Sequence, residues 1–202
     1  MTGVSLGFWS ERYSLKTESV DPSAKSHSVE VLVASAGAGY SARIERTSDA
    51  DWQRMLDLNL TAPFRCLRRA VPEMRAAGYG RFVVIASTAA RIGEPYLAAY
   101  AASKHGVLGL VRAAAAELAG TGVTVNAVCP GFVDTPMTAT TIGNIVARTG
   151  HTSDQARSAL EGRQPIGRLI TPEEVAGAVW FCVASEAITG QAINVDGGTV
   201  QS

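Results

Sequence analysis

The amino-acid sequence predicts an α/β fold built on a doubly wound parallel sheet. The first observation is a set of short apolar runs typical of buried strands, at positions 29–33, 80–86, 123–129 and 191–195. The second is a set of longer segments whose apolar side chains recur at helical spacing, at positions 50–77, 97–119 and 172–185. Because strands and helices alternate along the chain, the strands are expected to be parallel and joined by helical crossovers.

Length and composition indicate one globular domain and exclude several classes of protein. The 202 residues are 47% apolar and 18% charged, and eighteen basic residues balance eighteen acidic ones. This balance gives no electrostatic argument for binding nucleic acid or a charged membrane. The three cysteines, Cys66, Cys129 and Cys182, are far apart, which favours buried thiols in a reducing compartment. With no signal peptide and no apolar run that could span a bilayer, a soluble cytoplasmic protein is expected.

Residues 1–28 differ in character from the rest of the chain. They contain repeated serines and mixed charges without sustained periodicity, and they are expected to form an atypical polar N-terminal segment. Residues 29–202 are expected to form a single domain.

The segment 50–77 is predicted to be a long helix with an irregularity. Asp49 or Asp51 can cap its N-terminus, and Gly78 follows its last residues. Pro63 and Pro72 conflict with an uninterrupted helix, so a bend or local break is expected.

Three polar side chains are expected to meet at one edge of the sheet. Ser87 follows the strand at 80–86, while Tyr100 and Lys104 are four residues apart at the start of the next helix, on the same side. A free phenol has a pKa of about 10. An ammonium at about 4 Å favours phenolate by about 3 pK units, which predicts a general acid/base at Tyr100 and a substrate-oxygen donor at Ser87.

With Ser87 and Tyr100 thirteen positions apart, this stretch resembles the short-chain dehydrogenase/reductase family. The resemblance implies a Rossmann-like fold and catalytic roles for Ser87, Tyr100 and Lys104. Leu58-Asn59-Leu60 resembles the context of the family's catalytic Asn, which holds a water against the lysine. The resemblance therefore adds Asn59 to the predicted catalytic residues.

The resemblance also implies a set of residues that bind NAD or NADP. Ala36 and Gly37 match the end of the family's Asn-Asn-Ala-Gly motif, although Ala34 and Ser35 replace both asparagines. The loop after the strand at 123–129 resembles the one beside the nicotinamide. In this loop, the predicted cofactor-binding residues are Pro130, Gly131, Val133 and Thr135. The resemblance implies that Tyr100 and Lys104 also contact the cofactor. Residues 137–162 carry few large apolar side chains and are expected to be mobile, and the resemblance implies that this segment forms the substrate lid.

The N-terminal part of the family's nucleotide site has no clear counterpart. Two βαβ units need about 60 residues, and only 28 precede Val29. Thr2 to Trp9 echo the family's Gly-rich motif, but Trp9 replaces its last Gly. The domain is therefore expected to be N-terminally truncated, with impaired cofactor binding and without the region that selects NAD or NADP.

The predicted function is NAD(P)-dependent hydride transfer between nicotinamide and a ketone or secondary alcohol. Stretches 130–137 and 167–174 look most like those of β-ketoacyl reductases, which suggests a 3-oxoacyl thioester, with sugars and steroids as alternative substrates. One alternative is a cofactor-free, inactive relative that acts only through oligomerisation. Another is a fragment of a longer enzyme. The resemblance implies a homodimer or homotetramer, and the scattered histidines predict no metal site.

Overall fold

The computed structural model describes residues 29–201, and the predicted polar segment 1–28 lies outside them. Its sheet contains four strands: β1 (Val31–Ala34), β2 (Gly80–Ile85), β3 (Val123–Pro130) and β4 (Ala192–Val195). The strands lie in the order β1-β2-β3-β4, and every neighbouring pair is parallel. The predicted α/β fold with a parallel sheet is confirmed.

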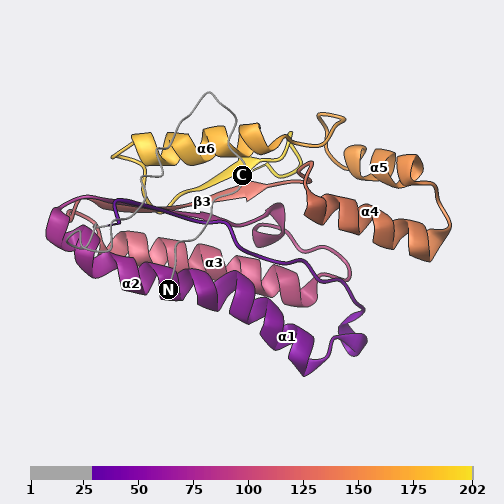
Figure 1. Ribbon diagram of the computed structural model, residues 1–202, viewed down its shortest axis with the longest axis horizontal. Helices are drawn as coiled ribbons and strands as arrows, with labels where there is room; N and C mark the ends of the chain where they lie inside the picture. Colours follow the sequence, from indigo (N-terminus) through magenta and orange to yellow (C-terminus); the bar gives the residue numbers. More distant parts are fainter. Residues whose placement is uncertain (1–28, 202) are drawn as a thin grey trace, which may run out of the picture.

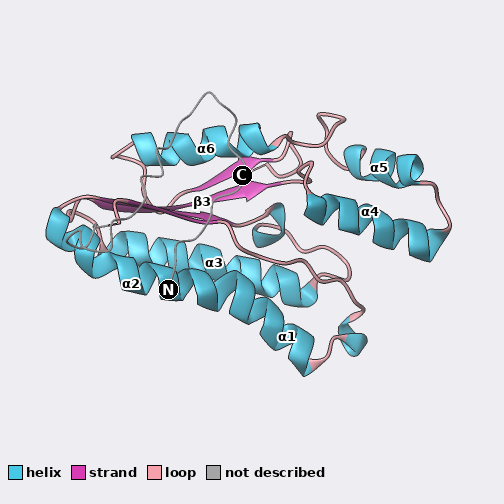
Figure 2. Ribbon diagram, in the orientation of Figure 1, coloured by secondary structure: helices cyan, strands magenta, loops and turns pink. Residues whose placement is uncertain are grey.

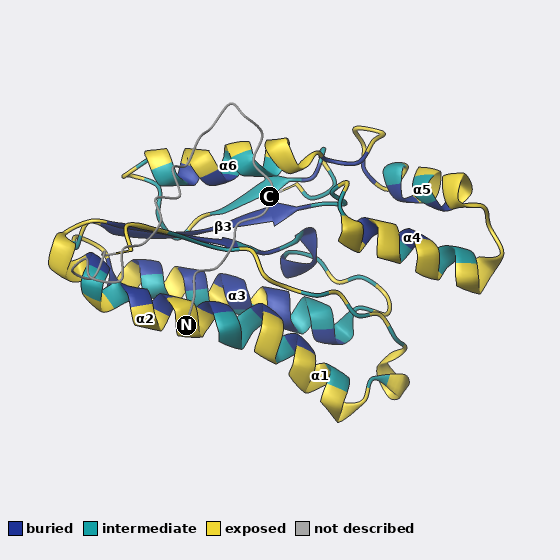
Figure 3. Ribbon diagram, in the orientation of Figure 1, coloured by how far each residue is buried: buried dark blue, intermediate teal, exposed yellow. Residues whose placement is uncertain are grey.

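Helices cover both faces of this sheet (Figures 1 and 2). The helices α1 (Asp49–Leu56), α2 (Ala62–Ala77) and α3 (Ala98–Glu117) lie on one side, and α6 (Pro172–Ala184) lies on the other. The side chains of successive residues in β2 pack alternately against the two helical layers. Phe82 and Val84 pack into the core with α2 and α3, whereas Val83 packs with Val179 and Cys182 of α6. Strand β3 is buried along its whole length between these layers (Figure 3).

The long predicted helix is interrupted where Asn59 lies. A π-helical turn, η2 (Asp57–Thr61), separates α1 from α2. Pro63 has no N–H to donate to the Asn59 carbonyl four residues earlier, so the regular α-helical pattern fails there. Pro72, by contrast, lies inside α2 without ending it, so the predicted break occurs at one proline only.

The N-terminal cap of this helix differs from the prediction. Ser48 is the capping residue, and its hydroxyl accepts a hydrogen bond from the Asp51 backbone N–H at 3.1 Å. Asp49 and Asp51 lie in the first turn instead, where negative charge interacts favourably with the helix dipole.

The predicted mobile lid consists of two helices, α4 (Pro136–Thr149) and α5 (Ser153–Glu161). They form a hairpin that extends from the end of the sheet at which β3 ends (Figure 1). Few large apolar residues are needed because Ile142, Leu160 and Leu169 form a small core of their own. A capping box between Thr152 and Gln155 starts α5.

Two single-turn 3-10 helices complete the described chain. They are η1 (Ile44–Arg46), before α1, and η3 (Thr88–Ala90), directly after Ser87. Within residues 29–201, none of these helices has the length and apolar character needed to cross a bilayer.

Candidate active site

Ser87 lies just beyond the carboxyl end of β2. It is the N-cap of η3, and its Oγ accepts a hydrogen bond from the Ala89 backbone N–H at 3.1 Å. The hydroxyl is therefore held at the strand end by the turn that follows it. In open α/β sheets, this is the edge at which ligands bind.

Tyr100 and Lys104 come from the first two turns of α3 and lie beside this strand end. Lys104 is buried, and its Nζ donates a hydrogen bond to the Ile85 carbonyl oxygen at 2.9 Å. The same Nζ lies 5.8 Å from the centre of the Tyr100 ring. The structure thus brings Ser87, Tyr100 and Lys104 together, as their spacing predicts.

The acid strength of Tyr100 differs from the prediction. Burial raises the pKa of this phenol above its usual value, the Ser87 hydroxyl opposes the rise, and the Glu94 carboxylate adds to it. Burial also lowers the pKa of Lys104 to about 8. The Lys104 ammonium is costly to keep charged in this buried environment, and it is bonded to the Ile85 carbonyl. It therefore does not lower the pKa of Tyr100 toward neutral pH. The phenol therefore stays protonated, which suits a proton donor.

Asn59 is buried in η2 and joins two parts of the site. Its Oδ1 accepts from the Ala38 N–H at 3.1 Å, and its Nδ2 donates to the Ala38 carbonyl at 3.0 Å. Nδ2 also lies 3.2 Å from Oγ of Ser103, which donates to the Tyr100 carbonyl at 2.7 Å. This network ties the loop after β1 to the helix that carries Tyr100. Sequence reasoning did not single out Ser103, a small polar residue on the inner face of α3.

Gly37 lies between the Asn59 and Lys104 side chains. A Cβ atom at this position would lie 2.9 Å from Asn59 Oδ1 and 3.6 Å from Lys104 Nζ. The close approach requires glycine here. Ala36, the preceding residue, is exposed on the same loop.

The predicted nicotinamide loop begins where β3 ends, at Pro130. Gly131 donates its backbone N–H to the Val195 carbonyl at 3.0 Å, and a Cβ here would lie 2.2 Å from Gln164 Oε1. Val133 pairs with Ile170 in an isolated parallel bridge, and the Thr135 hydroxyl donates to the Val133 carbonyl at 3.4 Å. The loop is thus held along its length by backbone contacts.

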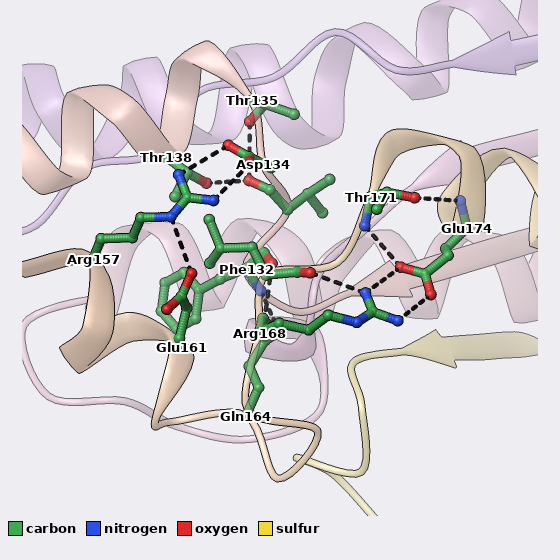
Figure 4. Close-up of polar contacts among 12 residues, drawn as sticks. Phe132, Asp134, Thr135, Thr138, Arg157, Glu161, Gln164, Arg168, Thr171 and Glu174 are labelled. Atoms are coloured by element: carbon green, nitrogen blue, oxygen red, sulfur yellow. Dashed lines mark hydrogen bonds and ion pairs between the residues drawn. The ribbon is translucent and has the colours of Figure 1, made fainter. Parts of the chain in front are cut away.

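Gln164 is a structural residue of this loop that the sequence pattern did not reveal. Its buried side chain accepts from the Phe132 N–H at 2.8 Å and donates to the carbonyls of Phe132, at 3.2 Å, and Arg168, at 2.7 Å (Figure 4). The amide replaces the backbone partners that a neighbouring strand would supply. Because the two bonds to Phe132 span 32 residues of sequence, no local pattern could predict them.

Two ion pairs flank the same loop (Figure 4). Arg157 bonds the Asp134 carboxylate at 2.7 Å and holds the pKa of Asp134 below its usual range. Arg168 bonds Glu174 at 2.7 Å and, with the helix cap at Thr171, lowers the pKa of Glu174 to about 2. Arg157 thus joins α5 to this loop, whereas Arg168 joins the segment after α5 to the first turn of α6 (Pro172–Ala184).

The described part of the chain, residues 29–201, contains no cluster of three or more His, Cys, Asp or Glu side chains that could hold a metal ion. Separately, the polar groups that gather at this edge are the hydroxyl of Ser87, the phenol of Tyr100, the amide of Asn59 and the ammonium of Lys104.

A family model described as Enoyl-(Acyl carrier protein) reductase matches residues 18–200. The chain belongs to the short-chain dehydrogenase/reductase family. It is 37% identical over 173 residues to a D-beta-hydroxybutyrate dehydrogenase of Rhizobium meliloti, covering 84% of this chain and 67% of the relative. It is 37% identical over 174 residues to a 3-oxoacyl-[acyl-carrier-protein] reductase of Thermotoga maritima, covering 85% of this chain and 66% of the relative.

Solved structures of the family share this fold. An actinorhodin polyketide ketoreductase solved with NADPH matches with a TM-score of 0.81 and 40% identity, over 85% of this chain and 67% of that one. The chain spans about two thirds of the length of these family members. The predicted family and its Rossmann-like fold are confirmed.

Proposed function

We propose that this short-chain dehydrogenase/reductase transfers hydride between a nicotinamide cofactor and the carbonyl carbon of a ketone, or the matching secondary alcohol. The observation that carries the proposal is the convergence of Ser87, Tyr100 and Lys104 at the carboxyl end of β2. Residues 29–202 act in this proposal as a single domain.

Each polar side chain has a distinct part in the proposed reaction. Ser87 donates a hydrogen bond to the substrate oxygen, and the protonated Tyr100 phenol delivers the proton that the alcohol product needs. Lys104 is anchored on the Ile85 carbonyl, so its ammonium keeps a fixed position near the phenol ring. Asn59 holds the loop after β1 against α3, and this contact fixes the position of the helix that carries Tyr100 and Lys104.

The residues around the strand ends fit the nicotinamide end of NAD or NADP, which would supply or accept the hydride. Gly37 and Gly131 lie on the two loops at this edge, and a Cβ at either position would press on Asn59 or Gln164, so both loops pack close to these side chains. Val133 and Thr135 offer the backbone and hydroxyl groups that we propose for the carboxamide. Within residues 29–201, however, no strand precedes β1, so the described chain lacks a Gly-rich turn between a first strand and a helix.

We propose a 3-oxoacyl thioester as the substrate. Relatives named as 3-oxoacyl reductase, polyketide ketoreductase and hydroxybutyrate dehydrogenase all have names that place a carbonyl or hydroxyl in an acyl chain. A steady-state assay with acetoacetyl-CoA, at millimolar NADPH or NADH, tests this proposal. The proposal is supported if the cofactor is consumed only when acetoacetyl-CoA is present. It is contradicted if acetoacetyl-CoA causes no consumption of NADPH or of NADH.

We expect the 202-residue chain alone to bind NADH or NADPH with a millimolar dissociation constant. Residues 29–201 offer no Gly-rich turn for the diphosphate; each charge-assisted hydrogen bond that it does not receive weakens binding by about 1.5–3 kcal/mol, and several together reduce affinity by powers of ten. Little turnover is then expected at micromolar cofactor. Titration of NADPH and NADH fluorescence measures the affinity directly. A micromolar dissociation constant would show that residues outside 29–201, or a partner chain, complete the site.

We also propose that the chain forms a homodimer or homotetramer. Large apolar side chains are exposed along α1, η2 and α2, at Trp52, Leu58 and Phe64. The commonest closed arrangement of soluble oligomers is an isologous dimer, and we propose that such a dimer covers this face. Sedimentation velocity at micromolar concentration should show a dimer or tetramer, and Phe64→Glu should dissociate it. A wild-type chain that sediments as a monomer would contradict the proposal.

A reducing compartment, such as the cytoplasm, completes the proposed setting. Cys66, Cys129 and Cys182 are free thiols, and the last two are buried. Free thiols are typical of proteins in reducing compartments.

A further inference from the structure

We propose that Arg91 is a positioning residue for this reaction, because it anchors the turn that carries Ser87 to strand β4. The inference rests on the roles proposed above for Ser87 and Tyr100. Arg91 lies four residues after Ser87 and is not among the catalytic or cofactor-binding residues that the family resemblance implies.

Arg91 ends η3, the turn whose first residue is capped by Ser87. Its backbone N–H donates to the Thr88 carbonyl at 2.8 Å, while the Ala90 N–H donates to the Ser87 carbonyl at 2.9 Å. From this position the guanidinium reaches across the sheet, and its Nη2 donates to the Ala192 carbonyl of β4. The three-residue turn is thus tied at one end to β2 and at the other end, through Arg91, to β4.

The guanidinium also lies against β3. Cys129 is fully buried, and burial raises the pKa of its thiol, while the neighbouring Arg91 and the Ser87 backbone oppose the rise. In the sheet, Cys129 is the register partner of Asn194, two residues after Ala192. Arg91 therefore meets β3 at Cys129, one residue before that strand ends, and β4 at Ala192, the first residue of that strand.

This arrangement is costly for stability. Among the buried side-chain atoms of the described chain, Arg91 Nε and Asn194 Oδ1 have no hydrogen-bond partner. Arg91 as a whole is half-buried, but its Nε N–H is enclosed without an acceptor, and such an unsatisfied donor destabilises the folded state. Its presence is explained if the position of η3, rather than stability, is what Arg91 provides.

The effect reaches the proposed proton donor through Ser87. The Ser87 hydroxyl opposes the rise in the pKa of the Tyr100 phenol, so the two groups interact. If η3 shifts away from β4, this interaction weakens, and both the phenol and the substrate oxygen lose a partner. A displacement of about 1 Å in such a group can lower turnover about 100-fold.

The test reads the Tyr100 environment without relying on turnover. Protein labelled with ¹³C at the tyrosine Cζ is compared by NMR at pH 7, with the Tyr100 signal assigned by its loss in Tyr100→Phe. Arg91→Met is expected to move this signal in the same direction as Ser87→Ala. Arg91→Lys, which keeps the charge but cannot span the same contacts, should move it less. Arg112→Met is the matched control, because Arg112 is exposed on α3, and it should leave the signal unchanged.

Kinetics at saturating cofactor provide the second readout. Arg91→Met is expected to lower kcat about 10- to 100-fold with little change in the cofactor KM, and Arg91→Lys should restore part of the loss. The inference is overturned if Ser87→Ala moves the Tyr100 signal while both Arg91 variants leave it in place. If Ser87→Ala itself has no effect, the proposed pairing of Ser87 with Tyr100 is wrong, and the role of Arg91 falls with it. Arg91→Lys keeps the test available should Arg91→Met not fold.

Discussion

Replacement of Tyr100 by Phe is expected to lower turnover of acetoacetyl-CoA by about 10²- to 10⁴-fold, the usual contribution of a general acid. Burial keeps the pKa of the phenol above its ordinary value, so at neutral pH the hydroxyl carries the proton that a reduced carbonyl oxygen requires. Phe retains the ring and removes the hydroxyl group that carries that proton. The measurement is the initial rate of NADPH consumption, with cofactor at millimolar concentration.

The matched control for this experiment is Tyr96→Phe. Tyr96 lies four residues before Tyr100 on the loop that leads into α3, and its side chain is exposed. Loss of its hydroxyl should leave the rate within about twofold, because an exposed hydroxyl exchanges its hydrogen bonds with water. The melting temperature of both variants should match that of the wild type. A Tyr100→Phe enzyme that turns over normally would refute the proposed mechanism.

Replacement of Gly122 by Ala is expected to destabilise the fold by about 2–4 kcal/mol. Gly122 has a φ of +80°, and a Cβ here would lie only 1.9 Å from the Gly78 carbonyl oxygen. The left-handed conformation costs a non-glycine residue about 1 kcal/mol. The collision with backbone adds the cost of moving the turn, about 1–3 kcal/mol for an overpacked position. The free energy of unfolding is measured by urea denaturation.

Gly120→Ala separates these two costs. Gly120 has nearly the same φ, +79°, but a Cβ at this position would meet no atom within 4 Å. It should therefore lose only about 1 kcal/mol, the conformational part. Equal losses in the two variants would show that the Gly122 turn moves freely away from Gly78. That result is not expected, because the Gly122 carbonyl accepts hydrogen bonds from Gly80 N–H at 3.3 Å and from Arg81 at 3.0 Å.

The strands, the main helices and the convergence of Ser87, Tyr100 and Lys104 could be predicted from local pattern. A buried strand needs only a short apolar run, and an amphipathic helix needs only the right spacing. Ser87, Tyr100 and Lys104 follow from the same logic, because a strand end and the first turns of the next helix must lie near each other in a parallel α/β unit. Helices α4 and α5 could not be predicted from apolar spacing in this way. Their stability comes from caps and from a small core to which Leu169, beyond both helices, also contributes.

By itself the sequence determined the family, the parallel sheet and which side chains gather at its carboxyl edge, since each depends on short-range order along the chain. Only the tertiary structure decided how those side chains behave. The pKa of Tyr100 rises instead of falling, because burial is a property of the packed site and outweighs the charge of a lysine bonded elsewhere. Gln164 and Arg91 act through contacts with residues 32 and 101 positions away. Such contacts arise when the chain folds back on itself, and no local spacing encodes them.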